Sequence, residues 1–233
     1  MLTKDMKELK TIAHINTDFP QKFGLPRQSG LIDELEGYIV FEKEYRNPEA
    51  LRGIEGYDYL WLLWGFEVRE DDIFKATVRP PRLGGNERMG VFATRSPFRP
   101  NHIGLSCVRL KEVKMTEDKG PIICVSGIDM RDGTPIYDIK PYLAYTDSHE
   151  GARSGFTDEI RPGTLEVDFA DELLERLPED KREGAKAVLA SDIRPSYQAG
   201  SKEEKSYCLS YAGFNIRFSV LGKKLTVTEV VKN

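Results

Sequence analysis

The residues with the clearest chemical potential lie in one run, Gly90 to Ser106 (GVFATRSPFRPNHIGLS), which holds two arginines and two prolines. Proline fixes its own backbone angle and restricts the residue before it to extended conformations. Ser96 and Arg99 each precede a proline, so we expect a stiff loop that presents guanidinium groups at set angles. Guanidinium groups bind carboxylates and phosphates in a planar, bidentate way, which predicts a site for an anionic ligand. A rigid surface connection with solvated arginines is the alternative.

The arginines of this loop belong to a wider basic stretch. Between Arg79 and Arg99 the chain has five arginines, one acidic residue (Glu87) and no lysine. A solvated surface normally mixes lysine with arginine, so an arginine-only stretch favours recognition of planar anionic groups. The whole chain, in contrast, has a net charge of −4, which argues against a general attraction to nucleic acid.

Three other polar clusters lie elsewhere: FPQKFGLPRQ from Phe19 to Gln28, DMRDGTPIYDIKPY from Asp129 to Tyr142, and DIRPSYQ from Asp192 to Gln198. Each has an ordinary structural explanation by itself, since Asp132 heads a good turn pair and Arg194 could cap a helix. Together they allow a polar ligand site that combines guanidiniums, carboxylates and aromatic rings. Residue types alone do not identify its chemistry.

Several familiar enzyme motifs are missing from the sequence. No GxGxxG follows a strand, and neither a Walker lysine motif nor a GxSxG nucleophile motif is present. The three histidines lie far apart, so we expect no metal site. The cysteines, Cys107, Cys124 and Cys208, are widely spaced without a CxxC pair, so we expect reduced core residues in a cytoplasmic protein.

Length and composition predict a soluble globular protein. The chain has 233 residues, of which 39% are hydrophobic and 31% charged. Its longest apolar run, Tyr59 to Phe66, has eight residues and is too short to span a membrane. The opening MLTKDMKELK is charged and lacks an apolar stretch, so we expect no signal peptide and a cytoplasmic location.

The N-terminal region is predicted to be a succession of short strands separated by Gly, Pro and Asn clusters, a spacing that suggests a closed barrel. The expected strands are Leu9 to Asn16, Gly37 to Glu42, Asp58 to Phe66, Phe74 to Arg79, Met89 to Thr94, Leu105 to Met115, Ile122 to Gly127 and Ile136 to Ile139. Imperfect alternation between Leu105 and Met115 predicts a β-bulge in that strand. A helical turn is expected at Pro48 to Arg52.

From Tyr142 to Pro162 the composition shifts to Ser, Gly, Thr, Asp and His, which indicates a linker or a long loop. The elements expected beyond it are a strand at Thr164 to Phe169, a helix around Leu173 to Leu177, a helix that begins near Pro178, and strands at Ser206 to Tyr211, Phe214 to Val220 and Lys224 to Val231. The expected fold class is mainly β, with a barrel domain over residues 1–145, a linker over 146–162 and a small α+β domain over 163–233.

The segments FGLPRQ (Phe23 to Gln28), RPPRLGGNERMGVFATRSPFRPNHIGLS (Arg79 to Ser106) and DGTPIYDIKPY (Asp132 to Tyr142) resemble, in that order and spacing, the TsaA-like family. These are the tRNA threonylcarbamoyladenosine methyltransferases. DIRPSYQ and the later YAGFNIRFSV resemble the smaller C-terminal domain of the bacterial members. The resemblance implies an S-adenosylmethionine-dependent homodimeric enzyme on a β-barrel, acting on the modified adenosine beside the anticodon at position 37.

The resemblance also implies the residues of the cofactor site. The family contacts fall on Pro26, Arg27, Gln28, Phe66, Glu67, Arg95, Leu105, Asp129, Met130, Arg131 and Asp132. In this reading Arg27 or Arg95 meets the cofactor's carboxylate, and Asp129 or Asp132 its ribose hydroxyls. Glu67 stands where relatives commonly carry His, so we expect a backbone contact rather than a side-chain contact at position 67. His102 stands where they commonly carry Pro, which loosens that loop slightly.

For the acceptor side we expect three catalytic residues near the end of the barrel sequence. Asp138 is predicted to accept the proton of the carbamoyl-adenine nitrogen, Lys140 to meet the threonyl carboxylate, and Tyr142 to contact the base. An Asp138 locked in place by Lys140 is the structural alternative. The residues expected to bind tRNA are Arg79, Arg82, Arg88, Arg99, Arg194 and Tyr197.

Two other functions remain open from the sequence. One is a methyltransferase with a different acceptor, and the other is a module that binds S-adenosylmethionine without transferring its methyl group. Fold alone does not separate them. No metal and no membrane are expected as partners.

Overall fold

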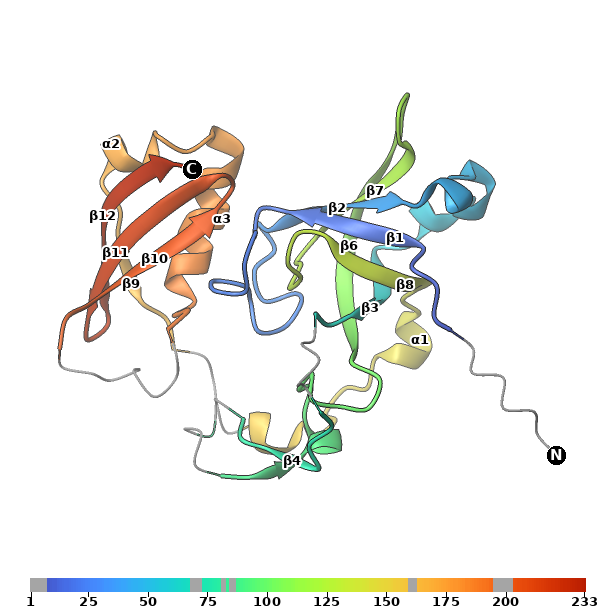
Figure 1. The fold of residues 1–233 in the computed structure, drawn as a ribbon, viewed down its shortest axis with the longest axis horizontal. Coiled ribbons are helices and arrows are strands. Elements are labelled where there is room, and N and C mark those ends of the chain that lie inside the picture. The colour runs from blue at the N-terminus through green and yellow to red at the C-terminus, as the bar shows by residue number, and fades with distance from the viewer. Residues whose placement is uncertain (1–7, 68–72, 81–82, 84–86, 159–162, 195–202) are drawn as a thin grey trace.

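The computed structural model describes residues 8–67, 73–80, 83, 87–158, 163–194 and 203–233. It has two parts, a β-barrel built from the first half of the chain and a smaller sheet with a covering helix at the C-terminus (Figure 1). The predicted mainly β fold, with a barrel followed by a small α+β unit, is confirmed. No helix in the described residues is long and apolar enough to cross a membrane.

The barrel closes through strands that are not all neighbours in sequence. Its strands run in the order β1-β2-β7-β6-β3-β8, each antiparallel to the next. Their bounds are β1 Ala13–Thr17, β2 Glu36–Phe41, β3 Tyr59–Gly65, β6 Ile103–Thr116, β7 Gly120–Ser126 and β8 Thr134–Pro141. The small interior is filled by alternating apolar side chains such as Ile15, Ile39, Leu62, Val108 and Ile136, all fully buried.

Two irregularities bend the barrel strands. The ladder between β6 and β7 shifts register between Leu110 and Glu112, which confirms the bulge predicted from the imperfect alternation of β6. A second shift lies in the β3–β8 ladder between Leu63 and Trp64. This second bulge sits near the end of the barrel where several loops converge.

The predicted strands Phe74 to Arg79 and Met89 to Thr94 are largely wrong. The structure has only β4 (Thr77–Val78) and β5 (Met89–Gly90), which pair with each other outside the barrel. Phe74 and Phe92 are exposed and Val91 is the buried residue of the Met89 to Thr94 stretch, so neither stretch has the alternating buried face that would support a long strand. The first strand is also shorter than expected, since it begins at Ala13 and Leu9 is exposed.

Short helical turns connect the barrel strands. They are Lys43–Tyr45, Pro48–Leu51, Ile54–Gly56 and Val91–Ala93, with helix α1 (Ala144–Asp147) and a turn at Gly155–Thr157 after β8. The turn expected at Pro48 to Arg52 is confirmed, and Asn47 Oδ1 caps it by accepting the Glu49 N–H.

The C-terminal unit is a four-stranded sheet in the order β10-β11-β12-β9. Its elements are β9 Glu166–Asp168, α2 Asp171–Leu174, α3 Glu179–Ala190, β10 Lys205–Tyr211, β11 Phe214–Leu221 and β12 Lys224–Lys232. Helix α3 begins directly after Pro178, as predicted. Ala212 and Gly213 both have positive φ, at 51° and 78°, and form the expected two-residue hairpin turn.

The cysteines differ in burial, which partly contradicts the expectation of three core residues. Cys124 is buried and Cys107 half-buried, but Cys208 is exposed. Cys208 lies on β10 next to the buried Leu209, so the strand's alternation turns it away from the core.

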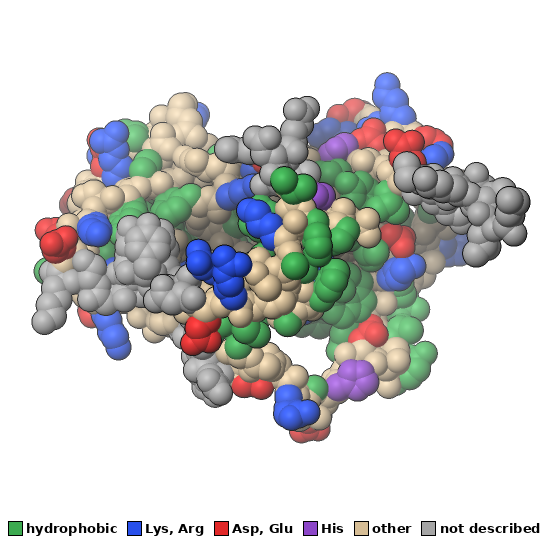
Figure 2. Space-filling model, turned by 60° about the horizontal axis from the view of Figure 1, so that its bottom comes forward, with side chains coloured by type: hydrophobic (Ala, Val, Ile, Leu, Met, Phe, Trp, Pro, Cys, Tyr) green, Lys and Arg blue, Asp and Glu red, His purple; other side chains and the backbone are tan. Residues whose placement is uncertain are grey.

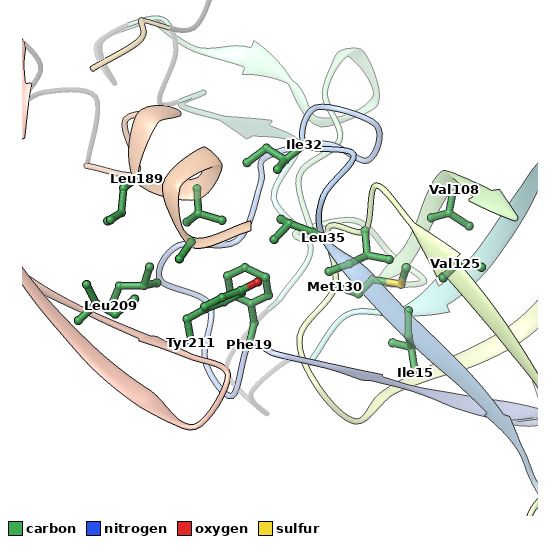
Figure 3. Close-up of a cluster of buried hydrophobic side chains, with 14 of the residues drawn as sticks. Ile15, Phe19, Ile32, Leu35, Val108, Val125, Met130, Leu189, Leu209 and Tyr211 are labelled. Atoms are coloured by element: carbon green, nitrogen blue, oxygen red, sulfur yellow. The ribbon is translucent and has the colours of Figure 1, made fainter. Parts of the chain in front are cut away.

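The two units share one continuous hydrophobic core (Figure 3). The contact is made by residues 18–35, which connect β1 to β2 and which we call the β1–β2 loop. Phe19 of this loop packs on Tyr211 of β10 with ring centroids 5.2 Å apart, and Leu35 is fully buried beside helix α3. Burial of each such side chain contributes about 2 kcal/mol.

Polar contacts fix the same junction. Lys181 of α3 pairs with Asp18 at 2.8 Å, and both side chains are mostly shielded from water. Gln21 Nε2 donates to Ser210 Oγ at 2.7 Å, and the Ala212 N–H donates to the Asp18 carbonyl. The β1–β2 loop is therefore held by the C-terminal unit as well as by the barrel.

Helix α3 approaches the sheet so closely that one position requires glycine. A Cβ added at Gly184 would lie 2.4 Å from Tyr211 Oη and 3.3 Å from Leu35 Cδ2. Alanine normally favours a helix interior by about 1 kcal/mol over glycine. We nevertheless expect Gly184→Ala to destabilise the protein by about 1–3 kcal/mol in urea unfolding, because overpacking outweighs helix propensity.

The clash can be tested by relieving it. Tyr211→Phe removes the hydroxyl and leaves the ring atom Cζ 3.5 Å from the added Cβ, an ordinary contact distance. The double variant Gly184→Ala/Tyr211→Phe should recover most of the lost stability. If it is no more stable than the single Gly184→Ala variant, the close approach is not the cause.

Candidate active site

A pocket of about 710 Å³ opens at the end of the barrel where the β1–β2 loop, the Arg95–Arg99 loop and the β7–β8 connection meet. This volume lies in the range of small-molecule sites. The lining residues are Lys22, Leu25, Pro26, Arg27, Gln28, Trp64, Gly65, Phe66, Glu67, Arg95, Pro97, Arg99, Ile103, Gly104, Leu105, Asp129, Met130, Arg131, Gly133, Thr134 and Pro135.

The pocket gathers segments that are far apart in the sequence. Of the residues expected to bind the cofactor, all but one line it: Pro26, Arg27, Gln28, Phe66, Glu67, Arg95, Leu105, Asp129, Met130 and Arg131. The exception is Asp132, whose Oδ1 accepts hydrogen bonds from the Thr17 N–H at 3.0 Å and Asn16 Nδ2 at 3.3 Å. Asp132 therefore holds the β7–β8 connection against β1, immediately beside the lining residue Gly133.

Asp129 is the most strongly held carboxylate in the pocket. Ser106 Oγ donates to Asp129 Oδ1 at 2.7 Å, and Trp64 Nε1 donates to Ser106 Oγ at 2.9 Å. Burial raises the pKa of Asp129 above its ordinary value. The hydrogen bonds from Ser106 and the Ser29 N–H, and the charge of Arg95, oppose this rise without cancelling it. Asp129 is thus a preorganised acceptor whose basicity depends on its neighbours.

The hydrogen-bond chain from Trp64 to Asp129 depends on a missing side chain. A Cβ at Gly104 would lie 2.3 Å from the Trp64 ring, so only glycine lets the indole cross the barrel end at this point. Ser106 is fully buried, and it was not predicted as a site residue. Sequence alternation could have indicated this role. Ser106 lies two residues after Gly104 in β6, so it shares the inward face of that strand.

Two of the four arginines that line the pocket, Arg27 and Arg95, are linked through the side-chain amide of Gln28. Arg95 Nη1 donates to Gln28 Oε1, and Gln28 Nε2 donates to the Arg27 carbonyl. Arg27 Nη2 in turn donates to the carbonyl of Arg194 at 3.3 Å, in the C-terminal unit. The Arg27 guanidinium is therefore positioned by both parts of the fold.

Glu67, which departs from the family pattern, has a defined partner. Its carboxylate pairs with Arg131 Nη1 at 2.9 Å, and its carbonyl accepts from Lys22 Nζ at 3.4 Å. The side chain of Glu67 thus neutralises one arginine at the rim of the pocket.

The expected catalytic residues lie outside the pocket lining. Lys140 and Asp138 of β8 are paired with Trp61 and Leu63 of β3. Trp61 and Leu63 alternate with the buried residues of β3, so both cross-strand pairs lie on the outer face of the barrel. Lys140 Nζ and Asp138 Oδ2 are 2.9 Å apart. This is the ion pair named as the structural alternative for Asp138.

Tyr142 lies on the same outer face. Its ring centroid is 5.9 Å from that of Trp61 and 6.0 Å from that of Tyr59. The three predicted catalytic residues therefore share the outer face of the barrel and do not line the pocket. The Tyr142 N–H donates to the Tyr59 carbonyl at the start of β3, whereas the pocket residues Trp64 and Gly65 are at the end of that strand.

The residues expected to bind tRNA are placed in different ways. Arg79 and Arg88 are exposed, and Arg99 lines the pocket while donating to the carbonyls of Thr94 and Ser96. Arg194 is only 4% exposed, and its guanidinium binds both carboxylate oxygens of Asp192 at 2.7 and 2.8 Å. Arg194 therefore presents no free guanidinium to a phosphate. Arg82 and Tyr197 lie outside the described residues.

Basic side chains gather near the middle of the face that carries the β4–β5 pair (Figure 2). Within the described part of the chain, no group of three or more His, Cys, Asp or Glu residues is placed to hold a metal ion.

Comparison with known proteins agrees with this architecture. Residues 14–148 match the tRNA-methyltransferase O N-terminal domain, and residues 162–233 match the TrmO C-terminal domain. A tRNA (adenine(37)-N6)-methyltransferase of Escherichia coli K12 is 39% identical over 219 residues, which cover 91% of this chain and 93% of the relative. A putative S-adenosylmethionine-dependent methyltransferase, RcsF, of Pseudomonas aeruginosa is 39% identical over 194 residues, covering 80% and 81%.

Solved structures show the same fold over the full length. A crystal structure of TrmO from Pseudomonas aeruginosa superposes with a TM-score of 0.76 at 29% identity, covering 97% of this chain and 99% of the other. The resemblance carried by the motifs FGLPRQ, RPPRLGGNERMGVFATRSPFRPNHIGLS and DGTPIYDIKPY is confirmed, and the chain belongs to the tRNA-methyltransferase O (TrmO) family.

Proposed function

We propose that this protein is an S-adenosylmethionine-dependent methyltransferase that methylates the exocyclic nitrogen of threonylcarbamoyladenosine at position 37 of tRNA. The observation that supports it best is the single pocket in which the family's motif residues from three distant segments converge. The family relative of Escherichia coli is named for methylation of adenine 37 at N6. The proposal includes action in the cytoplasm, because its acceptor is tRNA.

The pocket's donors and acceptors fit the proposed cofactor. Arg27 and Arg95 are cations suited to its carboxylate, and the Asp129 carboxylate is an acceptor suited to its hydroxyl or ammonium groups. Phe66 and Leu105 supply apolar surface for its adenine. Ser106 and Trp64 act one step further out, by holding Asp129 in position.

When bound, S-adenosylmethionine supplies a methyl group that its sulfonium has already activated. The protein's own task is then chiefly to align the acceptor nitrogen, which is catalysis by positioning. The rigid, proline-containing loop Arg95–Arg99 and the doubly anchored β1–β2 loop are suited to this task, because neither has to be ordered at the moment of reaction.

On the acceptor side we propose that Asp138 accepts the proton from the carbamoyl-adenine nitrogen, Lys140 meets the threonyl carboxylate and Tyr142 contacts the base. Their common surface on the outer face of β8 supports one shared role, since a carboxylate, an ammonium and an aromatic ring lie together there. A homodimer is part of the proposal, as the family resemblance implies.

Methyl transfer is tested directly on tRNA. Incubation of the protein with S-adenosylmethionine and tRNA, followed by mass spectrometry of anticodon-loop nucleosides, should show one added methyl on threonylcarbamoyladenosine and none on unmodified adenosine. Methylation of a different acceptor would favour the broader methyltransferase reading. Cofactor binding without transfer to any tRNA would favour a sensor.

The chain from Ser106 to Asp129 predicts a specific pH dependence of cofactor binding. Protonation removes the negative charge of Asp129 and weakens it as a hydrogen-bond acceptor, so the affinity for the cofactor falls as the pH is lowered through the pKa of Asp129. Ser106→Ala removes a hydrogen bond that lowers this pKa, so the pKa rises further, and the pH range in which affinity is lost moves toward neutral pH. Calorimetric titration with S-adenosylhomocysteine from acidic to neutral pH measures the shift.

Ser126→Ala is the matched control, because Ser126 is also a buried barrel serine. That variant should keep the wild-type pH profile. An unshifted acid limb in Ser106→Ala would mean that Asp129 does not bind the cofactor in its ionised form.

The role of Asp138 is separable from cofactor binding. Asp138→Asn should leave the affinity for S-adenosylhomocysteine near wild type and lower kcat at least about tenfold, as expected for loss of a proton acceptor. Asp168→Asn is the control, since Asp168 makes a comparable surface pair with Lys224 at 3.0 Å in the C-terminal sheet. Wild-type turnover by Asp138→Asn would remove this residue from the mechanism.

A further inference from the structure

An arm formed by residues 73–80 and 87–99 carries large apolar side chains into solvent. Phe92 is 73% exposed and Phe74 is 49% exposed, and their rings are stacked with centroids 6.3 Å apart and an interplanar angle of 29°. We call these two rings the aromatic platform. Exposed phenylalanines in contact with each other usually mark a binding surface.

The platform is held in place by the backbone. The Val91 N–H donates to the Ala76 carbonyl at 3.0 Å, and the Lys75 N–H donates to the Phe98 carbonyl at 3.2 Å. The β4–β5 ladder joins the same two segments. The two rings are therefore presented by a preformed element, and little conformational entropy is lost in ordering them when a ligand binds.

Cations lie beside the platform and on the neighbouring ring of Phe98. The Arg99 guanidinium carbon lies 6.0 Å from the centroid of the Phe92 ring, and Lys75 Nζ lies 3.9 Å from that of Phe98. Glu87 is the sole acidic residue among the described residues of the arm. Its basic residues are Lys75, Arg79, Arg88, Arg95 and Arg99.

The platform is continuous with the candidate active site. Arg95, Pro97 and Arg99 line the pocket, and Arg99 also reaches Phe92. An RNA chain whose target base approaches the mouth of this pocket from the side of the arm would therefore run past Phe92 and Phe74.

Stacking surfaces flanked by arginine and lysine suit single-stranded nucleic acid. Bases stack on aromatic side chains while cations bind the phosphates, and such stacking is tolerant of sequence. A second copy of this chain is a poorer occupant, because a two-fold contact through the arm would bring its cationic residues against themselves.

We propose that the aromatic platform stacks unpaired anticodon-loop nucleotides that flank the target adenosine. This inference rests on the proposed tRNA acceptor and adds a surface, Phe74 and Phe92, that the arginine-based prediction did not include. Base stacking at this surface contributes to affinity and directs the loop toward the pocket.

The test uses the full-length protein and a fluorescently labelled anticodon stem-loop RNA. Phe92→Ala and Phe74→Ala should each raise the Kd for this RNA about tenfold, the effect typical of one lost stacking contact. The dependence of Kd on salt should stay as in wild type, because no phosphate contact is lost. Phe92→Tyr, which keeps the ring, should bind as wild type does.

Two controls separate stacking from other effects. Met115→Ala removes a comparably exposed apolar side chain on β6 and should leave RNA binding unchanged. Arg88→Ala should weaken binding and also flatten the salt dependence, by a slope of about one. Thermal melting and S-adenosylhomocysteine titration confirm that the Phe variants remain folded with an intact pocket.

Unchanged Kd in both Phe→Ala variants would overturn the inference. A lower oligomeric mass of these variants in light scattering, with RNA affinity unchanged, would assign the platform to a contact between copies and also overturn it. Platform-dependent RNA binding without methyl transfer would leave the inference standing and reject the proposed function, so the two failures are distinguishable.

Discussion

The structure depends on the packing of the β1–β2 loop between two units. Phe19, Ile32 and Leu35 are buried against the C-terminal sheet and helix α3, while Pro26, Arg27 and Gln28 of the same loop line the pocket. A loop of this length would otherwise lose considerable conformational entropy on binding a ligand. Here the entropy is lost on folding, and hydrophobic burial offsets it.

The pocket shows how strand alternation and glycine together position polar groups. In β6, the same alternation that buries Val108 in the core places Ser106 beneath Asp129. Gly104 leaves room for the Trp64 ring, whose N–H then completes the chain to the carboxylate. A buried carboxylate is costly, and these hydrogen bonds reduce the cost without removing it.

Much of the fold could be predicted from the sequence because its elements are locally encoded. The strands of the barrel and of the C-terminal sheet, the start of α3 after Pro178 and the Ala212-Gly213 turn follow from short-range patterns. The arm was misread, because Phe74, Val78 and Phe92 look like strand residues but have no core to pack against. Local propensity does not reveal whether a partner surface exists.

The candidate site was predicted unevenly for a related reason. The motif residues of the pocket carry a long sequence signal, but Ser106 and Trp64 act through contacts that only the closed barrel creates. Arg194 looked like a phosphate ligand, yet the left-handed backbone at Asp192 (φ 50°) turns that carboxylate onto its guanidinium. The placement of Asp138 on the outer face likewise depends on the register of β8 against β3.

The shared core has a consequence for how such chains can be recombined. By sequence the β1–β2 loop belongs to the barrel, yet its buried residues Phe19 and Leu35 pack against β10 and α3. A chimera that joins this barrel to the C-terminal unit of a relative would have to import residues 18–35 with the incoming unit. The segments to be exchanged together are thus residues 18–35 and the C-terminal unit, which are not contiguous in the sequence. Exchange at the linker between the two folded parts would separate them.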